Sequence, residues 1–72
     1  ESAVRSAGML RDMPIDLAKT WYARLRHAML DGSSDAALMM DHATDILAQR
    51  IGQVGVDALI DRVDAERMAE DP

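Results

Sequence analysis

The sequence predicts an all-α protein: a small antiparallel bundle of three main helices preceded by a short N-terminal helix. Two observations favour this class. Apolar residues recur at three- and four-residue spacing along most of the chain. The 72 residues are 49% hydrophobic but only 3% aromatic, whereas strands favour aromatic and β-branched residues. A chain of this length forms at most one domain. We therefore expect residues 1–72 to be a single helical domain, and the first residue, Glu1, suggests an excised domain or a processed chain.

The longest helical pattern covers residues 14–31 and holds the only Trp and the only Tyr of the chain. One apolar stripe consists of Ile15, Ala18, Tyr22, Leu25 and Met29. A second stripe beside it contains Leu17, Trp21 and Ala28, so the apolar arc is wide, as expected of a helix packed against two neighbours. Proline is favoured at a first helical position and disfavours helical angles just before it, so the helix should begin at Pro14.

The remaining helices are placed by their apolar faces and by glycine at their ends. We expect a first helix over 2–12, a third over 35–51 and a fourth over 56–69. Gly32 should provide a left-handed C-terminal cap, with Ser33 or Ser34 capping the next helix. So short a loop predicts an antiparallel helical hairpin. Gly52 is expected to end the third helix, with residues 53–55 as the connection.

Composition limits the functional classes. The net charge of −5 disfavours non-specific binding to nucleic acid or to an anionic membrane. No apolar run approaches the roughly 20 residues that span a bilayer. The chain has no cysteine, so it can form neither a disulfide nor a cysteine-based metal cluster, which suits a cytoplasmic protein. The bias toward Arg, Asp and Ala is typical of a GC-rich bacterial genome.

One short segment resembles the start of a helix-turn-helix of the phage-repressor type: Leu47-Ala48, Ile51 and Gly52. The segment departs from that pattern at Gln53, where a branched apolar residue is usual, and at Asp61, which should point into the core. The helix that would read DNA is acidic, so phosphates would repel it. We expect no nucleic-acid binding.

Three aspartates of the fourth helix share one face at i, i+4 and i+7: Asp57, Asp61 and Asp64. They are either a solvated face or an acidic ladder for a basic partner surface. A candidate surface is the central helix, in the same chain or in a second copy, through Lys19, Arg24 and Arg26.

No motif for chemistry is visible, so we expect no catalytic, cofactor-binding or metal-binding residues. His27 and His42 have no ligand partner at metal-site spacing. Ser33 and Ser34 lie in no nucleophile motif and are better explained as helix caps.

The sequence therefore favours a protein–protein interaction or oligomerisation domain, cytoplasmic and part of a bacterial regulatory protein. Self-association, as a homodimer, or a protein partner would supply the stability that so short a chain lacks. Aromatic residues and methionine suit adaptable association surfaces, so the expected adhesive residues are Trp21, Tyr22, Leu25 and Met29, with the acidic ladder setting specificity. The alternatives are a ligand-sensing domain with an apolar pocket lined by Met and Trp21 and, more remotely, a DNA-binding regulator or an enzyme subunit.

Overall fold

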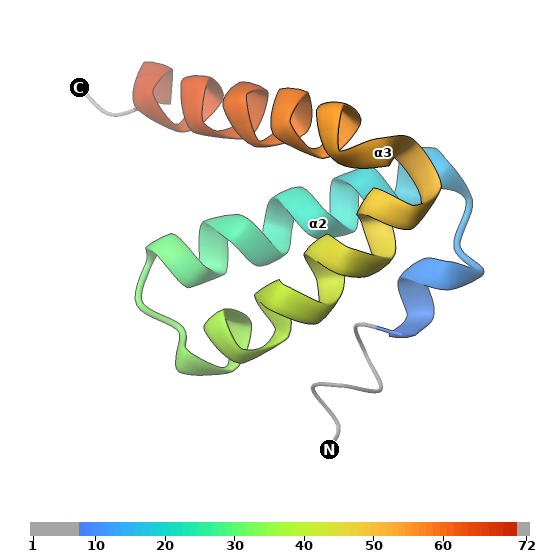
Figure 1. Cartoon of the computed structure of the whole chain (residues 1–72). Coiled ribbons are helices and arrows are strands. Elements are labelled where there is room, and N and C mark those ends of the chain that lie inside the picture. Colours follow the sequence, from blue (N-terminus) through green and yellow to red (C-terminus); the bar gives the residue numbers. More distant parts are fainter. Residues whose placement is uncertain (1–7, 71–72) are drawn as a thin grey trace.

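The computed structural model describes residues 8–70, which are mostly helical and contain no strand. A short 3₁₀ turn, η1 (Met9–Arg11), is followed by α2 (Ile15–Leu30) and α3 (Ser34–Glu70) (Figure 1). The all-α class is confirmed. The predicted number of helices is wrong, because the described residues contain two α-helices rather than three and a shorter one.

The main correction concerns α3, which covers both the predicted 35–51 and 56–69 helices. Residues 53–55, expected as a connection, are helical, and Gly52 alone leaves helical angles, with φ 79° and ψ 163°. One residue therefore bends the helix sharply, and the helix resumes at once. We call residues 34–51 the first limb of α3 and residues 53–70 its second limb.

The predicted first helix, 2–12, lies partly outside the described residues. Within them, Gly8 is α-helical, the 3₁₀ turn Met9–Arg11 follows it, and Asp12 is a turn residue. The prediction of an α-helix is therefore wrong for residues 9–12. A guanidinium holds the turn in place: Arg50 in the first limb donates to the carbonyls of Leu10, at 2.8 Å, and of Met13.

The two ends of α2 lie within one residue of their predicted positions. Pro14 is the N-cap, with ψ 140°, and its carbonyl accepts from the Ala18 amide at 2.9 Å. At the other end Gly32 has φ 100°. The Gly32 amide donates to the Met29 carbonyl and the Ser33 amide to the Ala28 carbonyl, both at 3.0 Å, which is the Schellman arrangement.

The turn into α3 also follows the sequence prediction. The Ala36 amide donates to the Ser33 hydroxyl at 3.2 Å, so this serine caps the first turn of α3. The predicted hairpin between α2 and the first limb is present. Glycine ends one helix and serine begins the next, and neither depends on distant contacts.

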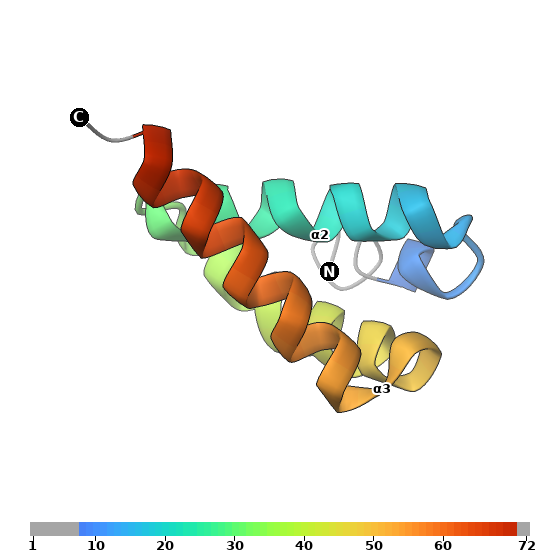
Figure 2. The ribbon, with the colours of Figure 1, turned by 90° about the horizontal axis from the view of Figure 1, so that it is seen from above.

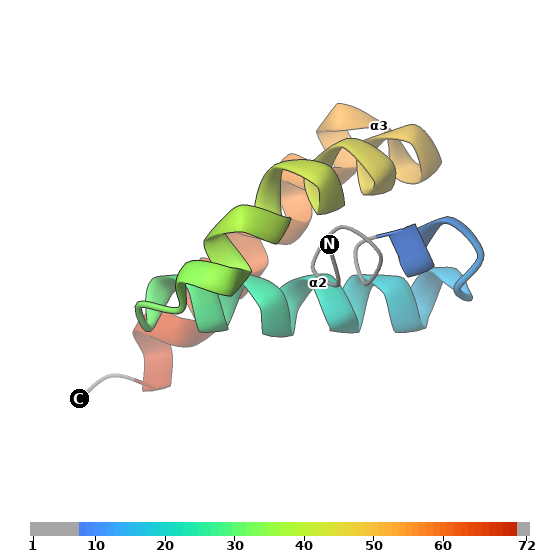
Figure 3. The same ribbon diagram turned by 90° about the horizontal axis from the view of Figure 1, so that it is seen from below.

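Because of the bend at Gly52, α2 packs against both limbs of α3 (Figure 1). Seen from above, the second limb crosses α2 obliquely (Figure 2). From below, η1 lies beside the start of α2, on the side of the first limb (Figure 3). The wide apolar arc of α2 is thus covered from two sides within one chain.

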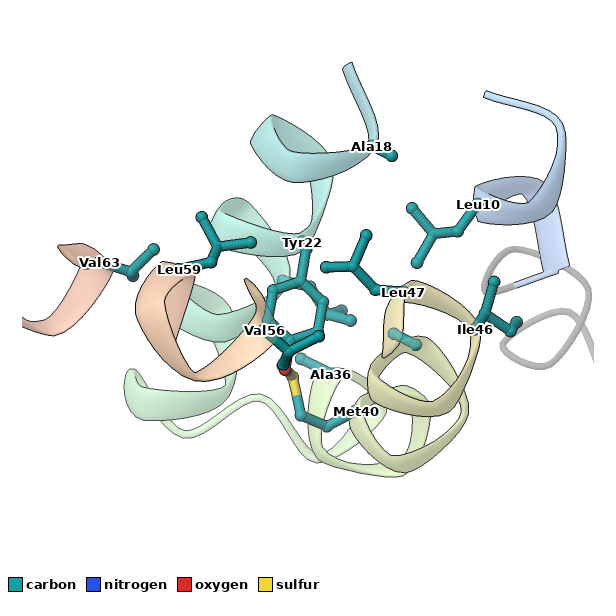
Figure 4. Close-up of a cluster of buried hydrophobic side chains, with 12 residues drawn as sticks. Leu10, Ala18, Tyr22, Ala36, Met40, Ile46, Leu47, Val56, Leu59 and Val63 are labelled. Atoms are coloured by element: carbon teal, nitrogen blue, oxygen red, sulfur yellow. The ribbon is translucent and has the colours of Figure 1, made fainter. Parts of the chain in front are cut away.

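Side chains from all three elements form one core (Figure 4). Tyr22, 1% exposed, is its largest fully buried side chain, and its hydroxyl forms a 2.7 Å hydrogen bond with the Thr44 hydroxyl. The core residues are Leu10, Ala18, Tyr22, Leu25, Ala36, Met40, Ala43, Ile46, Leu47, Val56, Leu59 and Val63. Trp21 and Met29 are half-buried and pack against this core from its edge.

Candidate functional site

The four residues expected to be adhesive are divided between core and surface. Tyr22 and Leu25 are 1% and 6% exposed, so the folded chain presents neither to a partner. Trp21 and Met29 keep part of their surface. Of the four, only Trp21 and Met29 keep surface that a partner could contact, and the stripe through Tyr22 stabilises the fold itself.

The acidic ladder on α3 is also divided. Asp64 lies against α2, where its carboxylate accepts two hydrogen bonds from Arg26, Nε to Oδ1 at 2.9 Å and Nη2 to Oδ2 at 3.0 Å. Asp57 accepts from Gln53 at 3.0 Å, and Asp61 is exposed. Arg26 is thus a basic partner supplied by the same chain, one of the two sources considered from the sequence.

The two parallel hydrogen bonds between Arg26 and Asp64 shift the pKa of both side chains. The hydrogen bond from Arg26 lowers the pKa of Asp64, and the same bond raises the pKa of Arg26. Each charge favours the ionised form of its partner. The pair fastens the second limb of α3 to the middle of α2.

A second polar cluster, not anticipated from the sequence, joins the C-terminal turns of the two helices. Arg67 Nη1 lies 3.1 Å from His27 Nδ1, and Arg67 Nη2 donates to the Asp31 carboxylate. That hydrogen bond lowers the pKa of Asp31. An arginine donor requires Nδ1 of His27 to accept, which places the proton of a neutral ring on Nε2. Residues about 40 positions apart meet here, and no local sequence signal links them.

A groove follows the line where α2 meets the second limb. It consists of two adjoining hollows, of about 380 and 410 Å³, that share Lys19, Leu59 and Arg62. One hollow adds only apolar surface and glycine, from Ile51, Gly55 and Ala58. The other adds polar groups, among them Asp16, Thr20 and Glu66. We call the apolar hollow, of about 410 Å³, the Lys19–Arg62 groove. Its floor is apolar, and its lining residues within 8–70 include two cationic side chains and no acid.

An apolar surface lies at the start of α2. Met9, Asp12, Met13 and Leu17 line an open hollow of about 340 Å³, and Met9 and Leu17 are 58% and 55% exposed. We call this the Met9–Leu17 face. Trp21 follows Leu17 by one helical turn but does not line the hollow. This hollow is therefore not the pocket lined by Met and Trp21 that the ligand-sensing alternative requires.

Three further findings concern residues 8–70 only. No group of three or more histidine and carboxylate side chains is placed to hold a metal ion. No helix in this part of the chain has the length and apolar character needed to cross a bilayer. Every buried side-chain nitrogen or oxygen there has a hydrogen-bond partner.

In comparisons with protein-family models, curated proteins and solved structures, no match to this chain was found.

Proposed function

We propose that the chain is a protein–protein interaction domain that joins two copies of itself through the Met9–Leu17 face. The observation that carries the proposal is the exposure of large apolar side chains beside a hollow, 58% for Met9 and 55% for Leu17. Single exposed apolar residues are ordinary, whereas a contiguous group is typical of an association surface. Trp21, half-buried one turn along, adds the kind of ring that contributes most to binding energy.

The charges around this face favour a second copy as the partner. Leu17, Trp21 and Arg24 follow one another at i, i+4 and i+7, so they share one side of α2. Arg24 is exposed, and it has no hydrogen bond or ion pair within residues 8–70. Asp12 lies at the opposite end of the face. Two copies packed antiparallel about a two-fold axis would place each Asp12 near Arg24 of the other copy, and such self-complementarity is what a symmetric dimer needs.

The size of the chain supports the same reading. A domain of 72 residues buries a smaller share of its surface than a larger domain does and is marginally stable alone, and association is a common remedy. We also propose a cytoplasmic location, because small secreted domains usually carry disulfides and this chain has no cysteine. As the parent we propose a bacterial regulatory protein, because the bias toward Arg, Asp and Ala is typical of a GC-rich bacterial genome.

Light scattering over a dilution series tests the proposal. We expect a dimer that dissociates on dilution and a melting temperature that rises with protein concentration. Leu17→Glu should abolish the dimer because it buries a charge in the contact. Met68→Glu is the matched control: Met68 is 77% exposed near the end of α3, away from this face, and its replacement should leave the dimer intact. A single-chain mass at all concentrations, or equal behaviour of the two variants, would refute the proposal.

A further inference from the structure

We propose that the Lys19–Arg62 groove of one copy receives an acidic, leucine-bearing stripe from the first limb of α3 of a second copy. The inference rests on the proposed self-association for the identity of the partner, but it uses different surfaces. It gives each chain a second contact, between two unlike surfaces.

The receiving groove combines an apolar floor with two cationic side chains, one without a partner and one with a weak partner among residues 8–70 of the single chain. Its floor consists of Ile51, Gly55, Ala58 and Leu59. Lys19 stands at its edge, half-buried, and it has no hydrogen bond or ion pair within the described part of the chain. Arg62 contacts Glu66 at 3.6 Å, with side chains 74% and 62% exposed. An exposed i, i+4 pair of this kind contributes little and is readily exchanged for a better partner.

The entering stripe has the complementary composition. Leu38, in the second turn of the first limb, is 71% exposed, so it presents an aliphatic side chain that a partner could cover. Asp41 and Asp45 follow it at i+3 and i+7, on the same side of the first limb, and both are exposed. No hydrogen bond or ion pair engages either carboxylate within residues 8–70. One aliphatic side chain and two free acids thus lie in a row about 10 Å long.

The two surfaces match group for group. Leu38 would fill the apolar floor, and the two aspartates would reach Lys19 and Arg62. Complementary charge at the rim of a contact sets the register and the rate of association, while the buried aliphatic group holds the complex together. Because the groove and the stripe are different surfaces, their contact is head-to-tail and would join the dimers made by the Met9–Leu17 face into larger assemblies as the protein concentration rises.

Cysteine cross-linking tests this contact directly, because the natural sequence contains no cysteine. His42→Cys marks the stripe one turn from Leu38 and leaves the leucine and both acids intact. Ala58→Cys marks the groove floor. Gln53→Cys is the matched control, because Gln53 is exposed and lies about 140° around the second limb from Ala58. After mixing at micromolar concentration with a short bis-maleimide, the His42→Cys and Ala58→Cys chains should cross-link at least about tenfold faster than His42→Cys with Gln53→Cys. Docking raises the local concentration of the two thiols well above that in solution.

Charge exchange then identifies the groups responsible. Reversing Lys19 and Arg62 to Glu in the Ala58→Cys chain should remove the preference, as should reversing Asp41 and Asp45 to Lys in the His42→Cys chain. Mixing the two reversed chains should restore it. Salt should weaken cross-linking of the unreversed pair. Equal rates at Ala58→Cys and Gln53→Cys, or reversals without effect, would overturn the inference.

The failure of this inference is distinguishable from failure of the proposed dimer. With Leu17→Glu in both chains, the preference for Ala58→Cys should persist, because the groove and the stripe do not include Leu17. A dimer by light scattering without preferential cross-linking would leave the Met9–Leu17 face as the contact and remove the groove. Preferential cross-linking in chains that Leu17→Glu leaves fully associated would retain the groove and remove that face.

Discussion

Replacing Gly52 with alanine should destabilise the chain through its backbone alone. Gly52 has φ 79° and ψ 163°, a combination that L-residues with a side chain rarely adopt. A Cβ added there would have no atom within 4 Å, so no steric contact contributes. Holding alanine in these angles should cost about 1–3 kcal/mol of unfolding free energy.

The variant could escape this cost only by straightening α3. A regular helix would favour alanine over glycine by about 1 kcal/mol at this position. Straightening would also lift the second limb away from α2 and expose Val56, Leu59 and Val63, now 0%, 7% and 3% exposed. Exposing each costs about 1.5–3 kcal/mol, so the three together cost roughly 5–9 kcal/mol. The bend should therefore persist, and the variant should fold with lower stability.

Urea denaturation at 25 °C gives the free energies of unfolding, and melting curves should show a decrease of about 4–8 °C for each kcal/mol lost. Gly8→Ala is the matched control, because Gly8 has helical angles, φ −61° and ψ −23°, and equally open surroundings. That control should be neutral or slightly stabilising. If Gly52→Ala were as stable as the natural chain, the bend would not depend on glycine, and this reasoning would be refuted.

Three further results are expected. Tyr22→Phe should lose about 1 kcal/mol in the same urea experiment, because it removes the hydrogen bond to the Thr44 hydroxyl; an unchanged midpoint would contradict that bond. Leu47→Ala, at a position 0% exposed, should lose about 2–5 kcal/mol by the same measurement, and a loss below about 1 kcal/mol would mean that the site is not core. Arg26 lowers the pKa of Asp64, so the stability that this pair contributes is present at neutral pH and is lost as pH falls through the folded-state pKa. The melting temperature between pH 7 and pH 3 should therefore fall less steeply in Asp64→Asn than in the natural chain, and parallel curves would argue against the pair.

Local signals in the sequence were sufficient for the hairpin. Pro14, Gly32 and Ser33 act through their own backbone angles and caps, so their effects could be predicted without knowledge of the packing. Gly52 could not be treated in this way. The sequence marks it as a break, but whether a loop or a resumed helix follows depends on how Val56 and later residues pack against α2.

The candidate surfaces, too, were predictable from the sequence only where local pattern sufficed, and not where they depend on packing. Periodicity identified the apolar arc of α2, yet it could not say how much of that arc one chain would cover, and the bend in α3 buries Tyr22 and Leu25. The pairs made by Arg26 and Arg67 join residues 36–40 positions apart, for which sequence spacing gives no guide. The Lys19–Arg62 groove is the space between two crossing helices, so it exists only once their packing is known.

The hydrogen bonds from Arg50 tie an early part of the chain to a later one. The carbonyls of Leu10 and Met13 are held by a side chain 40 and 37 positions further on, so these bonds can form only once the first limb is present. Met9 and Met13 belong to the segment fixed in this manner. If two copies join through the Met9–Leu17 face as proposed, a nascent chain that still lacks residue 50 would not yet present that face in its final form, and nascent copies on neighbouring ribosomes would not pair prematurely.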